Sequence, residues 1–126
     1  MAQPDVREYE VRAASTDVFG RVLGAARNHH IVVDGPVQNG CPGEAITPGE
    51  LFLLGVAGCG VELVQVLANS QGIPLSGIAV DIHGMMDRSH PVRADLSLFN
   101  SVRLHFRMKG VTEQQGRQLV EAFKGK

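Results

Sequence analysis

Two cysteines are the most reactive side chains in the sequence, and Cys59 lies in the middle of its most apolar stretch, residues 49–72. As a thiolate, Cys59 could act as a nucleophile. The alternative, which the pattern by itself favours, is an inert core thiol, because free cysteine is among the most buried residue types. Cys59 lies three turns into the predicted helix, beyond the reach of the macrodipole, and Glu62 on the same face would oppose thiolate formation. A reactive Cys59 therefore requires a cation from elsewhere in the protein.

The segment that carries Cys59 has the boundaries of a long helix. Thr47 and Glu50 form a capping-box pattern around Pro48, and Gly72 followed by Pro74 is a typical helix end. The helix is apolar almost all the way round, and each of its interior glycines costs about 1 kcal/mol relative to alanine. These glycines are Gly55, Gly58 and Gly60. They predict a close approach to the backbone, either where another helix crosses or at the floor of a pocket.

Alternation of apolar and polar residues predicts strands before and after this helix. The predicted strands cover residues 8–14, 20–26, 29–36, 75–84 and 101–110. In the two later strands the even-numbered side chains are expected to face the core and the odd-numbered ones water. A loop over residues 34–49 precedes the helix, and a second helix over 111–123 carries a capping box from Thr112 to Gln115. The order β-β-(β)-α-β-β-α predicts an α+β fold with antiparallel sheets.

Length and charge narrow the class of protein. The 126 residues suit one domain, 1–126, although the abrupt end of the last helix leaves open whether the domain is incomplete at its C-terminus. Twelve basic and 13 acidic residues give a net charge of −1, which argues against nucleic acid and membrane surfaces as partners. The two cysteines form no disulfide framework and the N-terminus is polar, so a cytoplasmic protein is expected. Glu62 and Gln65 interrupt the apolar helix, which favours a buried helix over a membrane span.

The histidines give only a weak indication of a metal site. His29 and His30 are expected in the turn between two strands. His83 and His105 fall on the water-facing side of neighbouring predicted strands, where they could meet. A zinc site needs further ligands, so no metal is expected.

Three stretches together resemble the OsmC/Ohr superfamily (osmotically inducible protein C and organic hydroperoxide resistance proteins). They are "TPGELFLLGVAGC", "GIPLSGIAVDIHGMMD" and "NSVRLHFRMKGVT", and the resemblance runs from about Ile31 to Phe123. It implies antiparallel sheets wrapped around a long central helix in an intertwined homodimer with two active sites at the interface. It also implies that Cys59 is the peroxidatic cysteine, which a second cysteine and a dithiol reductant restore, without metal, haem or flavin.

The sequence departs from the peroxidase members of that superfamily at several site positions. No cysteine follows Cys59 within the 126 residues, so either the resolving cysteine lies beyond residue 126 or this member lacks it. Cys41 is the other thiol that could resolve a sulfenic acid, against the simpler interpretation of an ordinary loop cysteine. Arg21 is the best match to the arginine that lowers the thiol pKa in the family, Arg27 is its rival, and a solvated strand-end arginine is the alternative. Glu50 is nearest to the family's glutamate, but nine residues place it on the opposite helix face from Cys59, and capping explains it.

Two hypotheses of function follow. The first is an OsmC-like thiol-dependent peroxidase that reduces organic hydroperoxides, with Cys59 as nucleophile, Arg21 as thiolate stabiliser and Glu50 as a further candidate. The second is a dimer of the same fold that binds a small apolar ligand at its interface, with Cys59 inert. A structural protein without a ligand is a third and weaker interpretation.

Overall fold

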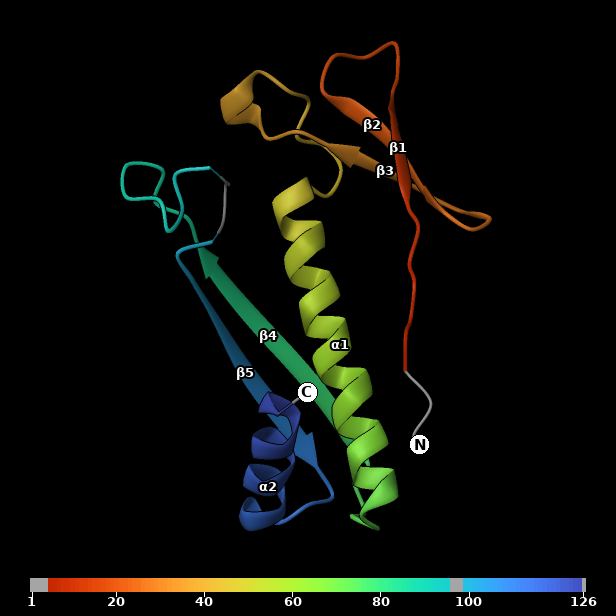
Figure 1. Cartoon of the computed structure of the whole chain (residues 1–126), viewed down its shortest axis with the longest axis vertical. Coiled ribbons are helices and arrows are strands. Elements are labelled where there is room, and N and C mark those ends of the chain that lie inside the picture. The colour runs from red at the N-terminus through yellow and green to blue at the C-terminus, as the bar shows by residue number, and fades with distance from the viewer. Residues whose placement is uncertain (1–4, 96–98, 126) are drawn as a thin grey trace. The chain divides into compact units, whose positions relative to one another are not determined.

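The computed structural model describes residues 5–95 and 99–125 of the chain. The described elements are the strands β1 to β5, the helices α1 and α2 and one short 3-10 helix, in the order β1-β2-β3-η1-α1-β4-β5-α2 (Figure 1). The chain divides into two compact units, residues 1–51 and 52–126. Helix α1 belongs to both, because it begins at the end of the first unit.

The first unit contains an antiparallel sheet in the order β1-β2-β3. Its strands are β1 (Arg12–Ser15), β2 (Arg21–Ala26) and β3 (His29–Asp34). The first strand is shorter than predicted: Tyr9 and Val11 precede it and are 84% and 79% exposed. The placement of His29 and His30 in the turn was wrong, because both belong to β3 and pair with Ala26 and Ala25.

The β2–β3 connection is a two-residue turn. Arg27 adopts a left-handed conformation there, with φ 55°. Strand pairing continues up to this turn because a two-residue hairpin fixes the register of the strands that it joins. The same register runs back to the other end of the hairpin, where Arg21 lies opposite Asp34.

The predicted loop before α1 folds back onto the end of the sheet. It contains the short helix η1 (Val37–Asn39), which ends at left-handed Gly40 with φ 77°. The backbone N–H of Asp34 donates to the carbonyl of Ile46 at 3.0 Å, and that of Gly35 donates to the carbonyl of Gly20 at 2.8 Å. The loop is thus tied to the β2 and β3 ends on both sides.

Helix α1 (Pro48–Ser70) begins and ends as the sequence predicts. The hydroxyl of Thr47 accepts from the backbone N–H of Glu50 at 3.3 Å, and Glu50 accepts from the backbone N–H of Thr47 at 3.0 Å. At the other end Gly72 is left-handed with φ 67°, and the N–H of Ile73 donates to the carbonyl of Ala68 at 2.9 Å. This is the hydrogen-bond pattern of a Schellman motif, which satisfies the last carbonyls of the helix.

The second unit packs helices on one face of a two-stranded antiparallel sheet, β4 (Gly77–Met85) and β5 (Ser101–Lys109). Figure 1 shows α1 and α2 (Glu113–Lys124) along the same side of this sheet. The predicted alternation is confirmed over most of the sheet: Ile78, Leu104 and Phe106 are half-buried, whereas the odd-numbered residues of β5 are exposed. Near the start of β5 it is not followed, because Val102 is 41% exposed. The core centres on Val64, Ala68 and Leu119, which are at most 2% exposed.

The predicted second helix and its cap are also confirmed. Thr112 accepts from the backbone N–H of Gln115, and the side chain of Gln115 accepts from the backbone N–H of Thr112. Leu119 is the fully buried residue of α2, and Phe123 meets Phe106 edge to face with ring centroids 5.6 Å apart. The architecture is therefore the expected mixed α+β fold with a long helix and antiparallel sheets.

Within the described residues, α1 is the one helix long and apolar enough to cross a membrane by length and composition. This is a weak indication, because the core helix of a soluble protein passes the same test. Four residues of α1 are buried, and Gly60 among them lies against Phe106 and Val80 of the sheet. Cytoplasmic localisation stays a prediction.

Candidate active site

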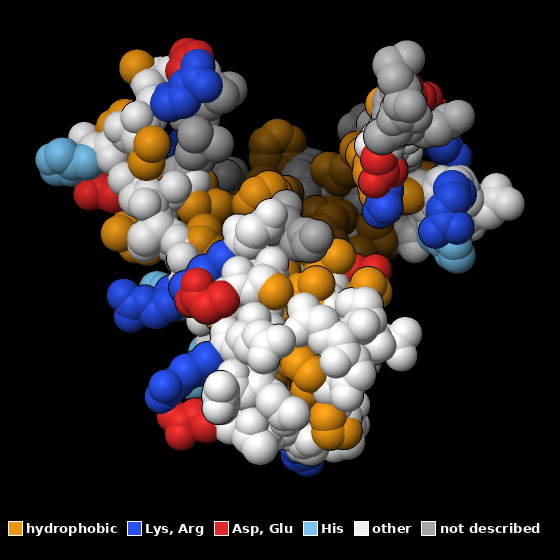
Figure 2. Space-filling view, turned by 60° about the horizontal axis from the view of Figure 1, so that its bottom comes forward, with side chains coloured by type: hydrophobic (Ala, Val, Ile, Leu, Met, Phe, Trp, Pro, Cys, Tyr) orange, Lys and Arg blue, Asp and Glu red, His pale blue; other side chains and the backbone are white. Residues whose placement is uncertain are grey.

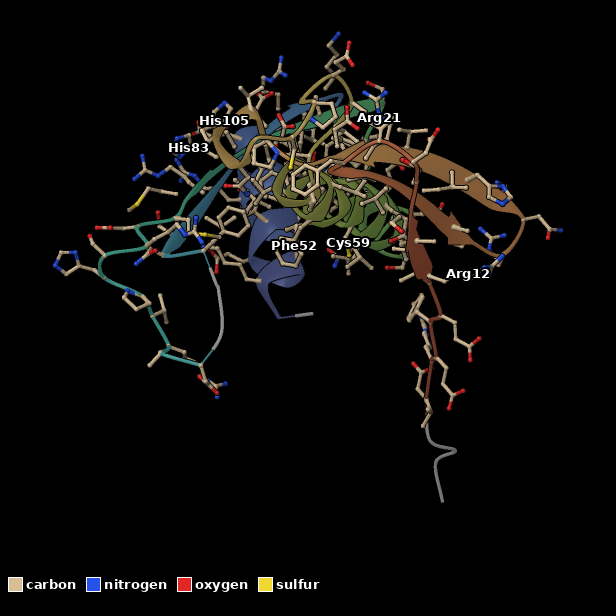
Figure 3. The ribbon with its side chains drawn as sticks, turned by 90° about the horizontal axis from the view of Figure 1, so that it is seen from above. Arg12, Arg21, Phe52, Cys59, His83 and His105 are labelled. Carbon is tan, nitrogen blue, oxygen red and sulfur yellow. The ribbon has the colours of Figure 1, made fainter. Side chains whose placement is uncertain are left out.

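Cys59 lies on the side of α1 that faces away from the β4–β5 sheet. The buried residues of α1 are Ala57, Gly60, Val64 and Ala68, which form the opposite stripe, whereas Cys59 is exposed. In Figure 3 the side chains of Cys59 and Phe52 project from the same side of α1. The helix of a single chain therefore does not bury this thiol among its core residues, in contrast to the core-thiol interpretation.

Apart from the exposed Glu62, the helix surface around Cys59 is largely apolar, and the described residues of the single chain leave it uncovered. A methyl group added at Gly55 or Gly58 would meet no described atom within 4 Å. Phe52 is 60% exposed although its ring stacks on that of Phe99 at a centroid distance of 5.9 Å. Leu54 and Val66 are 56% and 52% exposed, and exposed hydrophobic side chains of this kind appear as orange surface in Figure 2. Among residues 5–95 and 99–125, Gly60 alone of the three glycines has the close contact that the sequence predicts.

Arg21 is held by two carboxylates of the first unit. Its Nε donates to Oδ1 of Asp34 at 2.8 Å, and its Nη2 donates to Oδ2 of Asp34 at 2.9 Å. Nη2 also donates to Oε1 of Glu44 at 2.8 Å. The Arg21 side chain is 29% exposed, that of Asp34 is 0% exposed and that of Glu44 is 77% exposed. Asp34 is thus the buried member of the cluster and Glu44 the solvent-facing one.

The backbone contributes to the same cluster. Oδ2 of Asp34 accepts the N–H groups of Glu44 and Ala45, each at 2.9 Å. The hydrogen bonds from Arg21 lower the pKa of Asp34 far below its usual range; burial opposes this shift, and the backbone donors add to it. The same bonds raise the pKa of Arg21, so this ion pair is fully charged near neutral pH.

Cys41 lies against the glycines that flank this ion pair. An added methyl group at Gly20 or at Gly35 would overlap the Cys41 side chain, so its Sγ packs directly on both backbones. Gly20 also has a φ of 80°, which favours glycine on conformational grounds. The thiol lies 3.8 Å from the carbonyl of Asn39 and is partly exposed. This packing explains Cys41 as a structural residue of the loop.

The structure gives Glu50 a capping role. It is exposed, and it accepts from both the backbone N–H and the hydroxyl of Thr47 at 3.0 and 2.9 Å. These hydrogen bonds lower its pKa. The rival arginine, Arg27, lies in the β2–β3 turn at the far end of the hairpin from Arg21. Its backbone carbonyl accepts a long hydrogen bond of 3.4 Å from Arg12.

The histidines do not assemble a metal site. Figure 3 shows His83 and His105 on the β4–β5 sheet, both exposed, and register pairs them with Arg103 and Asp81. Within residues 5–95 and 99–125, no group of three or more histidine, cysteine or acidic side chains could hold a metal ion.

Sequence reasoning identified Arg21 but missed Asp34 and Glu44. A signal for Asp34 was present: a two-residue turn between strands of six residues pairs position 21 with position 34. Opposite charges at paired positions of adjacent strands attract each other. Glu44 gave no such signal, because its approach to Arg21 depends on how the loop folds back.

The family comparison matches a model described as OsmC-like protein over residues 41–125. No curated protein sequence matches the chain. An OsmC-like protein from Mycoplasma pneumoniae has a similar structure, with a TM-score of 0.80, 14% identity and coverage of 95% of this chain and 82% of that one. These values show a shared fold.

Two further similar structures come from proteins described as organic hydroperoxide resistance proteins. The Legionella pneumophila protein gives a TM-score of 0.72 at 21% identity and covers 97% of this chain and 85% of its own. The Elizabethkingia anophelis protein, with bound thiocyanate, gives a TM-score of 0.71 at 16% identity. The match covers 98% of this chain and 85% of that one. The family match spans more than half of the chain and includes Cys59. The chain therefore belongs to the OsmC-like protein family.

Proposed function

We propose that this protein is a thiol-dependent peroxidase that reduces organic hydroperoxides, with Cys59 as the nucleophile. The observation that carries the proposal is that the core of the single chain leaves Cys59 uncovered, on the side of α1 opposite its buried residues, in a chain of the OsmC-like family. A thiolate must reach its substrate to react, and a core thiol cannot. The similar structures of organic hydroperoxide resistance proteins support the same class of reaction.

The proposed reaction transfers one oxygen atom to sulfur. The Cys59 thiolate attacks the distal oxygen of the hydroperoxide, an S–O bond forms and the O–O bond breaks. The departing alkoxide takes a proton from water and leaves as the alcohol, while sulfur is oxidised to a sulfenic acid. The peroxide is thereby reduced by two electrons.

An external dithiol then restores Cys59. Its first thiol displaces water from the sulfenic acid to form a mixed disulfide, and its second thiol releases the Cys59 thiol and leaves an oxidised dithiol. We favour an external reductant over Cys41 because the Cys41 thiol is packed against Gly20 and Gly35. Arg21 is the proposed source of hydrogen bonds for the anionic sulfur or oxygen.

We further propose that the active form is a homodimer in which the uncovered side of α1 contacts a second copy. Three large apolar side chains of α1 are more than half exposed, and a Cβ atom added at Gly55 or Gly58 would meet nothing within 4 Å among the residues that the structure describes. Exposed apolar surface of this kind is typical of an interface. A second copy would supply the close contact that glycines in a helix predict.

The test compares Cys59→Ser with Cys41→Ser in an assay of tert-butyl hydroperoxide consumption with dithiothreitol as reductant. We expect Cys59→Ser to abolish consumption and Cys41→Ser to retain it. The second measurement is the pH dependence of iodoacetamide labelling of Cys59 in the folded Cys41→Ser protein. We expect the midpoint of labelling to lie below about 8.5, the usual value for a free thiol. Equal peroxide consumption by Cys59→Ser and the wild type would refute the proposal.

The exposed apolar residues beside Cys59 also favour a second candidate function, binding of a small apolar ligand at the dimer interface. Phe52 and Val66 could line such a site, because both are more than half exposed and lie seven residues from Cys59, on the same side of α1. This function requires no thiolate. It predicts no peroxide consumption by the wild type, together with equal binding of an apolar fluorescent dye by the wild type and Cys59→Ser.

A further inference from the structure

The face of the β4–β5 sheet that turns away from the helices is strongly basic. Ile78, Phe106 and Met108 pack against the core, so the odd-numbered side chains of the two strands project from the opposite face. His83 and His105 extend from that face in Figure 3. On β5 four successive odd-numbered positions, all exposed, form a basic stripe: Arg103, His105, Arg107 and Lys109.

This face is positive in a chain that is negative overall. Arg103, Arg107 and Lys109 contribute three positive charges, and Asp81, the acidic residue among the odd-numbered positions, contributes one negative charge. With the histidines counted as neutral, the face carries +2. Because the whole chain carries −1, the rest of it carries −3. Charge separated in this way directs an anionic partner to this face and away from the remaining surface.

Two cations of the basic stripe have no carboxylate partner within the described residues. Arg107 pairs with Asp81 at 3.0 Å. Among residues 5–95 and 99–125, Arg103 and Lys109 form no ion pair. The register also places Arg103 directly opposite His83, and two basic side chains at opposed positions repel each other when both are charged. The charge of Arg103 therefore remains available to an anionic partner.

The β4 side of the face leaves space beside the stripe. The residues that pair with Arg107 and Lys109 are Ala79 and Gly77, which have small side chains or none. A methyl group added at Gly77 would lie 3.7 Å from Cβ and Cδ of Lys109, so the aliphatic part of Lys109 lies beside this glycine. Arg107 stays 60% exposed although it is paired. An extended chain can therefore lie along β4 next to the cationic groups.

We propose that the basic stripe is a docking surface for an acidic polypeptide segment in extended conformation. An antiparallel strand rises about 3.4 Å per residue, so alternate residues of β5 and of an extended peptide both repeat at about 6.8 Å. A segment with a carboxylate at every second position matches the stripe in spacing as well as in charge. The guanidinium groups of Arg103 and Arg107 can each bind a carboxylate through two parallel N–H donors.

Other polyanions suit this face less well. The odd-numbered positions of β4 and β5, all within the described residues, hold no phenylalanine, tyrosine or tryptophan on which a base of single-stranded nucleic acid could stack. Anionic membranes attract clusters of about four to eight lysine and arginine residues, and this face has three. The net charge of −1 also opposes the long-range attraction of a large polyanion.

The test measures binding of fluorescein-labelled peptides to the full-length protein by fluorescence anisotropy. The probe is the peptide ETETETET, in which carboxylates alternate with a residue that favours extended structure. The controls are EEEETTTT, with the same charge in another arrangement, and the neutral QTQTQTQT. We expect ETETETET to bind at least about 3-fold more tightly than EEEETTTT, and QTQTQTQT not to bind. Raising NaCl from about 50 to about 300 mM should weaken binding at least about 10-fold, because these side chains are exposed.

Charge reversal within and outside the stripe locates the binding face. Arg103→Glu should raise the Kd for ETETETET at least about 10-fold, because a charge-assisted hydrogen bond is replaced by repulsion. Its matched control is Arg88→Glu, which makes the same change at another exposed arginine without an ion pair among the described residues, and which should stay within about 2-fold of the wild type. Lys109→Glu is a second variant of the stripe in case Arg103→Glu does not fold.

Three results would overturn the inference. They are equal affinity of a folded stripe variant and Arg88→Glu, equal affinity of ETETETET and EEEETTTT, and tighter stripe-dependent binding of single-stranded DNA or of phosphatidylserine vesicles than of ETETETET. None of these results bears on peroxide reduction, because Cys59 lies on the side of α1 that faces away from this sheet. The docking surface and the proposed function therefore stand or fall separately.

Discussion

Substitution of Gly58 by leucine tests the proposed contact between two copies of α1. A Cβ atom added at position 58 meets no described atom within 4 Å in the single chain, and the position is exposed, so the described residues leave space for a leucine side chain there. Leucine is a far better helix former than glycine, and the substitution should raise the free energy of unfolding of a monomer by about 0.8 kcal/mol. In isolation, therefore, Gly58→Leu is a stabilising change.

The same substitution should have the opposite effect on a dimer in which α1 contacts its copy. An extra side chain forced into a packed interface costs about 1 to 3 kcal/mol, and a two-fold symmetric dimer contains it twice. The dimer should weaken by about 2 to 6 kcal/mol, which is a rise in Kd of about 30-fold to about 20,000-fold. A more stable subunit and a weaker dimer from one substitution is a combination that no simple folding defect produces.

Sedimentation equilibrium over a series of protein concentrations measures the dimer, and urea unfolding measures the subunit. The matched control is Gln114→Leu, which adds the same side chain at an exposed position of α2. The control should leave the Kd within about threefold of the wild type. A folded Gly58→Leu protein that dimerises as tightly as the wild type would refute an interface at this face, and a wild type that stays monomeric would refute the dimer.

Three further predictions concern stability. Leu119→Ala, at a fully buried position, should lower the free energy of unfolding by about 2 to 5 kcal/mol, measured by urea unfolding. Its control, Leu54→Ala at a position that is 56% exposed, should change the free energy of unfolding of the monomer by no more than about 0.5 kcal/mol. Thr47→Ala removes the α1 cap and should cost about 1 kcal/mol, so an unchanged urea midpoint would contradict the capping role. The pKa of Asp34 is lower in the folded than in the unfolded protein, so its contribution is complete above the unfolded value, about 3.9, and decreases as the pH falls through the folded value. The stability of the wild type should therefore fall more steeply below about pH 4 than that of Asp34→Asn, measured by calorimetry, and parallel slopes would contradict this.

Local signals in the sequence determined most of the secondary structure. The ends of α1 follow from side chains within a few positions of each other, Thr47 with Glu50 at one end and Gly72 at the other. The faces of β4 and β5 follow from the period-two alternation of their residues. Such features depend on near neighbours in the chain, which is why they could be predicted without a tertiary structure.

The sequence also indicated which side chains could carry the chemistry, but not their surroundings. Cys59 and Arg21 were both candidates from their positions in motifs, whereas the buried partner of Arg21 was missed. The sequence did not indicate that the core of the single chain leaves Cys59 uncovered, because an apolar helix gives no indication of which side its own sheet covers.

The tertiary structure alone decided how loop and sheet combine around Arg21. Glu44 reaches Arg21 from 23 positions further along the chain because the loop after β3 folds back through Gly35, Cys41 and Ile46. Hydrogen bonds between residues so far apart leave no periodic pattern in the sequence. The helix, the strands and the candidate thiol were determined by the order of the residues, and the buried carboxylate that pairs with Arg21 was determined by the fold, since only packing places Asp34 out of reach of water.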